Sequence, residues 1–259
     1  MNMRELYDKA DYKDELGMCF RGDCLEVMKD IPDNSVDMIL CDLPYGTTKC
    51  KWDNIIPFEP LWEQYNRIIK ENGAIVLFGN QPFTAELIHS NIKNFKYCWT
   101  WDKKIPSGMS YAKYRPMQQT EDICMFTKNG KKTKYFPQMI KRDKPIKGGG
   151  MVASDSAFTR SYKPLKKTYK YKNPTTLLVY DKIRRNSLHP TQKPVALLEY
   201  LIKTYTNEGE AVLDNCMGSG STCMACKNTN RRYIGIELDD KYFDIACDRL
   251  NKGVKDAHD

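Results

Sequence analysis

The feature that most constrains this chain is a repeated alternation of short aliphatic runs with longer amphipathic stretches. Residues 36–42 (VDMILCD) and 74–78 (AIVLF) are continuous apolar runs, which are typical of strands buried on both faces. Between them, residues 58–70 carry apolar side chains at helical spacing. The dipeptide Asn72-Gly73 predicts the end of that helix.

The alternation continues along the rest of the chain. We expect further strands at residues 95–101, 122–127, 211–214 and 232–237, and further helices at 82–89, 194–205, 220–227 and 240–250. Strands that alternate with helices of about ten residues are typical of a doubly wound, mostly parallel sheet. The 259 residues suit one large domain of this Rossmann-like α/β class, with one smaller inserted piece.

The stretch from residue 103 to residue 186 interrupts the alternation and is strongly basic. Residues 128–172 contain 14 Lys or Arg and two Asp, although the whole chain has a formal net charge of +8. Such a block is an electrostatic footprint for a polyanion, and the alternative is a merely solvated surface. Aromatic residues interleave with the charges, which favours nucleic acid because bases stack on rings. We interpret 103–186 as an insertion with long mobile loops, between domain halves 1–102 and 187–259.

The composition of the chain predicts in which cellular compartment the protein lies. No run of about 18 apolar residues predicts a membrane span, and the polar first 15 residues lack the apolar segment of a signal peptide, so we expect a cytoplasmic protein with no membrane partner. The ten cysteines lie mostly in apolar stretches and are expected to behave as small buried side chains. Cys223 and Cys226 form a C-x-x-C pair, which we interpret as one flank of a helix. A zinc site needs about four ligands and no second pair has metal spacing, so we expect no metal.

A glycine loop near the C-terminus predicts a nucleotide-type cofactor site. In residues 212–222 (VLDNCMGSGST) a strand ends at Asp214, Gly218 and Gly220 flank Ser219, and a helix follows. Glu237 ends the next strand, 19 residues after Gly218, where it can accept hydrogen bonds from ribose hydroxyls. The alternative is a tight strand–helix turn that needs glycine for geometry alone. Because the spacing is not G-x-G-x-x-G, the loop favours S-adenosylmethionine over a dinucleotide.

A second group of residues, Asp42-Leu43-Pro44-Tyr45, ends the strand at 36–42. Ligands bind at the carboxyl ends of strands in open α/β sheets, although D-x-P-Y is also an ordinary turn. Asp42 and the carbonyl of Leu43 or Pro44 can both accept hydrogen bonds from an exocyclic base amine. Two such acceptors localise the lone pair of the nitrogen towards the methyl donor. Tyr45 can stack on a base that has left the duplex, which costs a few kcal/mol.

Taken together, these motifs resemble the β-class DNA amino-methyltransferases. The D-L-P-Y motif comes first, a target-recognition region follows, and the cofactor loop comes last, which is the permuted order of that class. The resemblance extends from about residue 19 to residue 250. Its further markers are residues 22–26 (GDCLE), 78–83 (FGNQPF), 101–104 (WDKK), 189–194 (HPTQKP) and 235–237 (GIE).

The resemblance implies roles for individual residues. Asp42, Leu43, Pro44 and Tyr45 form the catalytic loop, with Asp42 also beside the cofactor. Asp23 and Cys24 flank the adenine of the cofactor, and Glu237 holds its ribose. Asp214, Gly218, Ser219, Gly220, Ser221 and Thr222 line the methionine pocket. Lys193, with Thr191 nearby, meets the cofactor carboxylate, and His189 braces that loop.

The sequence departs from the family pattern in two places. Asp214-Asn215-Cys216 replaces the usual D-P-F, which we expect to loosen packing against the cofactor. Leucine replaces the first proline of the commoner D-P-P-Y, but it keeps the backbone carbonyl, so we expect no loss of function.

The resemblance implies methyl transfer to double-stranded DNA by base flipping, and an Asp-led motif goes mostly with adenine N6. Cytosine N4 stays open, as do a protein or RNA amino-methyltransferase and an inactive DNA-binding module. A homodimer and a cognate restriction endonuclease are compatible partners, but no residue indicates either. Candidate DNA-contacting residues are Arg115, Arg142, Arg160, Lys163, Lys166, Lys167, Arg184 and Arg185.

Overall fold

The computed structural model describes residues 2–46, 53–147, 168–183, 188 and 191–253. It divides into two compact units, one of Met1–Phe136 with Thr176–Asp259 and one of Pro137–Thr175. The second unit falls inside the expected insertion at 103–186, whereas residues 103–136 and 176–186 group with the main unit. Several expected residues lie outside the described ones, namely Arg160, Lys163, Lys166, Lys167, Arg184, Arg185 and His189.

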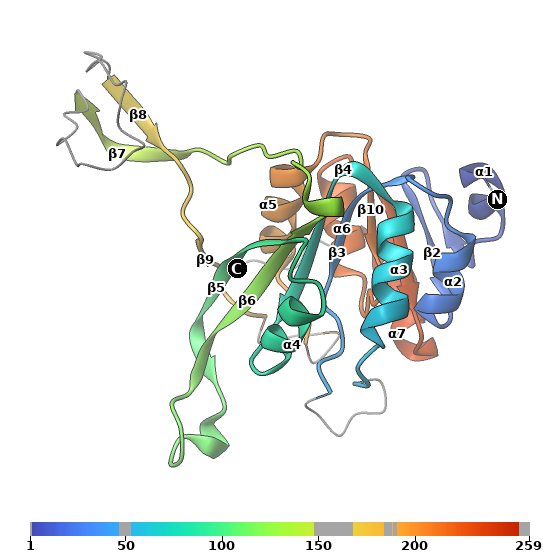
Figure 1. Cartoon of the computed structure of the whole chain (residues 1–259), viewed down its shortest axis with the longest axis horizontal. Coiled ribbons are helices and arrows are strands. Elements are labelled where there is room, and N and C mark those ends of the chain that lie inside the picture. The colour runs from blue at the N-terminus through green and yellow to red at the C-terminus, as the bar shows by residue number, and fades with distance from the viewer. Residues whose placement is uncertain (1, 47–52, 148–167, 184–187, 189–190, 254–259) are drawn as a thin grey trace. The chain divides into compact units, whose positions relative to one another are not determined.

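The main unit is built on a nine-stranded mixed sheet (Figure 1). Its order is β1 (Tyr12–Lys13), β2 (Gly17–Arg21), β11 (Arg232–Glu237), β10 (Ala211–Asp214), β3 (Val36–Cys41), β4 (Ile69–Gly79), β6 (Gln118–Thr127), β5 (Phe95–Ser107) and β9 (Leu177–Val179). The strands from β2 to β4 pair in parallel, and β6 is antiparallel to both of its neighbours. The predicted α/β class with a mostly parallel sheet is confirmed.

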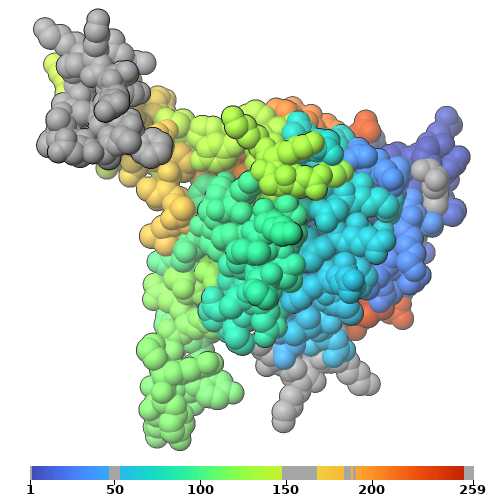
Figure 2. All heavy atoms as spheres, viewed as in Figure 1, coloured from blue at the N-terminus to red at the C-terminus, as the bar shows by residue number. Residues whose placement is uncertain are grey.

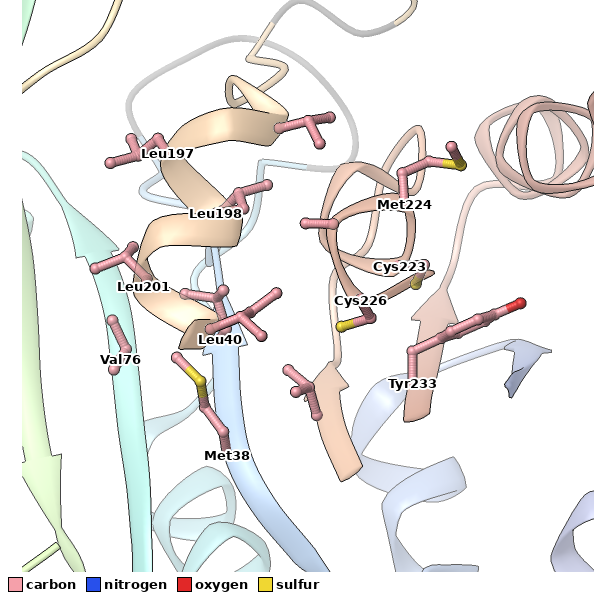
Figure 3. Close-up of a cluster of buried hydrophobic side chains, with 14 of the residues drawn as sticks. Met38, Leu40, Val76, Leu197, Leu198, Leu201, Cys223, Met224, Cys226 and Tyr233 are labelled. Atoms are coloured by element: carbon pink, nitrogen blue, oxygen red, sulfur yellow. The ribbon is translucent and has the colours of Figure 1, made fainter. Parts of the chain in front are cut away.

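Helices cover both faces of this sheet, as a doubly wound fold requires. On one face lie α2 (Cys24–Asp30), α3 (Phe58–Ile68) and α4 (Phe83–Ser90), and on the other lie α5 (Val195–Tyr205), α6 (Ser221–Asn228) and α7 (Asp240–Lys252). Each group seals its own buried cluster. Figure 3 shows the second cluster, in which Leu197, Leu198 and Leu201 of α5 pack towards Met38 and Leu40 of β3. A short α1 (Met3–Asp8) precedes β1.

The structure corrects the end of the helix expected at 58–70 and adds elements that the sequence pattern did not predict. The helix expected to stop at Asn72-Gly73 ends at Ile68, and Ile69 is already paired with Val36 of β3. Ile69 is fully buried, so its burial between strands overrides the turn signal that follows. The pattern also missed β2 and α2, because Gly17–Arg21 is short and Asp23 acts as the helix N-cap.

Two 3-10 turns and a long hairpin occupy the beginning of the expected insertion. The β5–β6 hairpin is closed by η1 (Met109–Tyr111), and η2 (Lys128–Gly130) follows β6. Since β6 is antiparallel to both β4 and β5, the chain in β5 runs parallel to that in β4. The tip of the hairpin therefore lies beyond the carboxyl ends of the central strands, and it stands clear of the body of this unit (Figure 2).

The second unit contains an antiparallel pair, β7 (Ile140–Lys147) and β8 (Thr168–Lys172), whose residues are almost all exposed. Long loops were expected here, whereas residues 140–147 and 168–172 form strands. Arg142 Nε donates to the Tyr171 carbonyl across the pair. Within the described part of the chain, no helix is both long and apolar enough to cross a bilayer.

Candidate active site

A cavity of about 420 Å³ opens at the carboxyl ends of β2, β3, β10 and β11, and its size is that of a small-molecule site. Asp42 and Gly218, which are 176 residues apart in the chain, both line it. Because β3 and β10 are parallel neighbours, the loops that follow them must leave the sheet at the same edge. The structure thereby brings together the two motifs that the sequence predicts to act together.

The glycine loop is a tight connection between β10 and α6. Gly218 (φ 50°) and Gly220 (φ 75°) adopt the left-handed conformation that other residues rarely accept. A side chain on Gly220 would also crowd Ala246, with the two Cβ atoms 3.1 Å apart. Gly220 does not line the cavity, so its part is to shape the turn, whereas Gly218 and Ser219 face the cavity.

Glu237 ties this loop to the end of β11. Its Oε2 accepts from the backbone N–H of Gly218 at 2.8 Å, and its Oε1 accepts from that of Asp239 at 2.8 Å. Burial raises the pKa of Glu237, and these two backbone hydrogen bonds act in the opposite direction. A carboxylate has about four lone-pair sites, so Glu237 keeps acceptor capacity for hydroxyl groups in the cavity.

Arg249 is a buried support that the sequence patterns did not reveal. It is 4% exposed on α7, and its Nη1 donates to the Ser219 carbonyl at 3.0 Å and to Ser221 Oγ at 2.9 Å. A buried guanidinium needs such acceptors, and here they are supplied by the glycine loop. Its position at the end of an otherwise amphipathic helix gave no signal that it points inwards.

The departure at Asn215-Cys216 is accommodated by a hydrogen bond. Tyr65 of α3 donates its hydroxyl to Asn215 Oδ1 at 2.5 Å, and both side chains are buried. Cys216 lines the cavity beside Cys24, with its N–H donating to Asp214 Oδ1 at 3.1 Å. The loop is thus anchored from the opposite helix layer, although it lacks the aromatic residue usual in the family.

The D-L-P-Y loop follows β3 and is held by side chains on both sides. Asp42 Oδ1 accepts from the Tyr45 hydroxyl at 2.6 Å, and the Tyr45 ring stacks on Phe83 with 4.9 Å between centroids. Asp53 Oδ1 accepts from the backbone N–H groups of Tyr45 and Gly46, at 2.8 and 2.9 Å. Asp53 is 6% exposed and is a second support that the sequence patterns did not reveal.

Lys193 lies just before α5 and contacts the D-L-P-Y loop. Its Nζ donates to Asp42 Oδ2 at 2.5 Å, and it lies 5.0 Å from the centroid of the Phe78 ring. Burial raises the pKa of Asp42, and the Lys193 ammonium opposes that shift. Burial likewise lowers the pKa of Lys193, but Asp42 and Glu121 outweigh it and raise the value above normal. Lys193 was expected to meet the carboxylate of a cofactor, and in this structure its partner is a carboxylate of the chain itself.

Most of the other predicted residues line the same cavity. Those that line the cavity with Asp42 and Gly218 are Asp23, Cys24, Leu43, Pro44, Tyr45, Thr191, Lys193, Asp214, Ser219, Ser221, Thr222 and Glu237. Asp23 also caps α2, since its Oδ1 accepts from Leu25 N–H at 2.8 Å. Arg115 lies on the β5–β6 hairpin, with its guanidinium carbon 5.1 Å from the Tyr111 ring centroid. Cys223 and Cys226 are buried on α6, as interpreted.

A family model described as DNA methylase, for N6 and N4 methyltransferases, matches residues 36–248. The chain belongs to this family. The methylase is 30% identical over 263 residues to the type II methyltransferase M.BglII of Bacillus subtilis, covering 92% of this chain and 70% of that protein. It is 27% identical over 268 residues to the DNA adenine methyltransferase YhdJ of Escherichia coli K12, covering 96% and 87%.

Solved structures agree with this assignment. The complex of M1.HpyAVI with SAM superposes with a TM-score of 0.61 at 27% identity and covers 91% of the methylase and all of that chain. The cytosine-N4-specific PvuII methyltransferase gives a TM-score of 0.64 at 17% identity, over 94% and 95%, which shows the shared fold. The methylase is a DNA amino-methyltransferase for adenine N6 or cytosine N4, and S-adenosylmethionine is its methyl donor.

Asp214 generates a prediction about pH and stability. Burial raises the pKa of Asp214 to about 6, with hydrogen bonds from Thr222 and Cys216 opposing the shift. Ionisation therefore costs the folded state more than the unfolded one, so Asp214 should reduce the free energy of unfolding as pH rises from about 4 to about 6. Asp214→Asn cannot ionise, and its stability relative to wild type should grow across that window by about 1–3 kcal/mol.

Urea denaturation followed by tryptophan fluorescence at pH 4 to 8 measures this difference. The matched control is Asp244→Asn, because Asp244 is exposed on α7 and pairs with Arg21 at 2.7 Å. That control should show no such growth with pH. A difference between Asp214→Asn and wild type that stays constant from pH 4 to 8 would contradict the assignment of a raised pKa to Asp214.

Proposed function

We propose that the methylase transfers the methyl group to N6 of adenine in duplex DNA, on a base that has left the helix. The observation that carries this proposal is the placement of the Asp42 carboxylate in the same cavity as the glycine loop. Asp42 is an acceptor for the amine, and the cavity has room for the donor beside it. Positioning these two reactants in line supplies much of the rate of such a transfer.

The bound S-adenosylmethionine supplies an electrophilic methyl group on a positively charged sulfur. Asp42 and the backbone carbonyl of Leu43 or Pro44 accept hydrogen bonds from the amine and draw its lone pair out of the ring. Asp42 is also placed to take the proton that the nitrogen loses, and burial raises its pKa in the direction that favours this. Tyr45, backed by Phe83, offers a stacked aromatic wall for the extruded base.

The cofactor-binding residues are proposed on the same geometric grounds. Glu237 holds the ribose hydroxyls, because its carboxylate faces the cavity and is fixed by two backbone donors. Asp23 and Cys24, at the start of α2, flank the adenine of the cofactor. Asp214, Gly218 and Ser219 line the methionine part, together with Ser221 and Thr222 from the first turn of α6.

Adenine is favoured over cytosine by the leading aspartate of the D-L-P-Y loop and by the resemblance to YhdJ, whose name specifies adenine. The experiment is to express the chain in a host without its own DNA adenine methylation and to map modified bases by single-molecule sequencing. We expect N6-methyladenine at one recurring sequence. N4-methylcytosine at a recurring sequence would overturn the choice of adenine, and unmodified DNA would overturn the proposed function.

Asp42→Ala tests the assignment of the acceptor. The variant should reduce methyl transfer to duplex DNA by at least about 10³-fold, because the amine loses its carboxylate partner. Affinity for S-adenosylmethionine, measured by calorimetry, should stay within about threefold, since the glycine loop and Glu237 are untouched. The matched control is Asp102→Ala, a half-buried aspartate on β5 that does not line the cavity and whose Oδ1 accepts from Gln119 Nε2. Transfer that persists in Asp42→Ala would refute the assignment.

The β5–β6 hairpin is the part of the described chain that we propose to contact duplex DNA. Tyr111 is 55% exposed and Tyr114 is 87% exposed, although aromatic side chains are usually covered. Lys113 and Arg115 lie beside them in the sequence, so stacking groups and phosphate partners alternate along one tip. The tip lies at the same edge of the sheet as the catalytic loop, within reach of the DNA that presents the base.

Two double variants separate these contributions. Lys113→Ala with Arg115→Ala should lower the slope of log K against log salt by about 2, because each cation releases about one counterion. Tyr111→Ala with Tyr114→Ala should weaken DNA binding by about 1–3 kcal/mol per stacked base and leave that slope unchanged. Fluorescence anisotropy with a labelled duplex measures both. Unchanged affinity in both double variants would remove the hairpin from the interface.

A further inference from the structure

Four charged side chains of alternating sign form a buried row that begins at the catalytic loop. Lys193 Nζ is 2.5 Å from Asp42 Oδ2 and 3.4 Å from Glu121 Oε2, and Lys103 Nζ is 3.0 Å from Glu121 Oε1. The side chains are 21% exposed for Asp42, 8% for Lys193, 15% for Glu121 and 5% for Lys103. They come from four separate segments, namely the D-L-P-Y loop, the loop before α5, β6 and β5.

Each oxygen of the Asp42 carboxylate already accepts one hydrogen bond, so an incoming target amine has to share an oxygen with Tyr45 or with Lys193. Oδ1 accepts from the Tyr45 hydroxyl at 2.6 Å, and Oδ2 accepts from Lys193 at 2.5 Å. An ammonium at that distance is a charge-assisted partner, which a neutral amine does not displace unless the ammonium has another place to go. Movement of Lys193 away from Oδ2 would therefore make Asp42 a stronger acceptor for the amine of a base.

The Glu121 carboxylate can accept the Lys193 ammonium when that ammonium leaves Asp42. Its Oε2 is shielded from solvent and has no hydrogen-bond partner among the residues that the structure describes. Burial acts to raise the pKa of Glu121, but Lys193 and Lys103 outweigh it and hold the value below normal, so the group is a carboxylate. A buried, charged oxygen without a hydrogen bond is costly, and a small movement of Lys193 would supply one.

We propose that Glu121 is a positioning residue that receives the Lys193 ammonium when the target amine reaches Asp42. The inference depends on the proposed role of Asp42 as acceptor. Lys193 stays paired with a carboxylate in both positions, so no buried charge is left alone during the exchange. Lys103 keeps Glu121 in place through Oε1, which leaves Oε2 directed at Lys193.

The alternative is that Glu121 is only the structural partner of Lys103. The two readings differ in what Glu121→Gln does. If Glu121 receives Lys193, an amide cannot hold the ammonium as well, and Lys193 remains on Asp42. We then expect kcat to fall by about 10- to 100-fold, while the KM and Kd for S-adenosylmethionine stay within about threefold. Glu121→Asp, which restores the charge with a shorter reach, should recover part of the lost kcat.

The pH dependence of kcat separates an effect of Glu121 on Asp42 from a loosened fold. The titratable groups that interact with Asp42 include Lys193, Glu121 and Tyr45, together with Asp214 and Cys41 from the ends of the two parallel strands. The negative charge of Glu121 acts to raise the pKa of Asp42. Removal of that charge should shift the acidic limb of the kcat profile to lower pH, even though the plateau is lower. A loosened fold would lower the plateau and leave the limb where it is.

Two further variants are controls for the Glu121→Gln experiment. Glu71→Gln is the matched control, since Glu71 is an exposed partner of Lys128 and Lys131 at the opposite end of β4, and its kcat should not change. Glu121→Gln combined with Lys103→Gln leaves no unpaired lysine in the row and should show the same loss of kcat as the single variant. Thermal unfolding and cofactor binding verify that each variant is folded.

The proposal is overturned if folded Glu121→Gln keeps kcat within threefold of wild type. It is also overturned if the double variant regains wild-type kcat, because the loss then comes from an unpaired Lys103, or if cofactor affinity falls as much as kcat. These outcomes differ from a failure of the proposed acceptor, which is read from transfer by Asp42→Ala. The assay measures transfer to any amine in DNA, so it does not depend on the choice of adenine.

Discussion

The parallel pairing of β3 with β10 is the constraint on which the site depends. Because the two strands run in the same direction side by side, the D-L-P-Y loop and the glycine loop leave the sheet at one edge. The pairing of β10 with β11 then adds Glu237 at the same edge. Helix layers on both faces keep these strands buried and in register, so the positions of the loops follow from the core.

Buried charge is the main electrostatic feature of the active site. Asp42, Asp214 and Glu237 are carboxylates whose pKa values burial raises, and they face one cavity. Such a cavity suits a cofactor with a positive sulfonium and ammonium, because a cation relieves the repulsion between the carboxylates. In the structure, the Lys193 ammonium balances the negative charge of Asp42. Farther from Asp42, the negative charge of Glu121 is balanced by the ammonium groups of Lys193 and Lys103, on strands of the β5–β6 hairpin and the loop before α5.

Most elements of the sheet could be predicted because their signals are local. The strands at Ala211–Asp214 and Arg232–Glu237 are found at the expected residues, since aliphatic runs bounded by glycine and charge are unambiguous. The helix end at Ile68 could not be predicted, because the burial of Ile69 against β3 outweighs the Asn72-Gly73 signal. The exposed strands β7 and β8 were also missed, since neither strand buries an apolar face, although residues 168–172 (TYKYK) alternate tyrosine with lysine.

The sequence by itself determined the class of fold, the two motifs and the chemistry that each can perform, because these depend on residue type and local spacing. Only the tertiary structure decided that Lys193 lies on Asp42, that Tyr65 anchors Asn215, and that Glu121 and Arg249 point into the interior. Those contacts join segments far apart in the chain. The physical reason is that a buried charge or amide must find its partner among whatever groups the packed layers bring close, and spacing along the chain does not specify that partner.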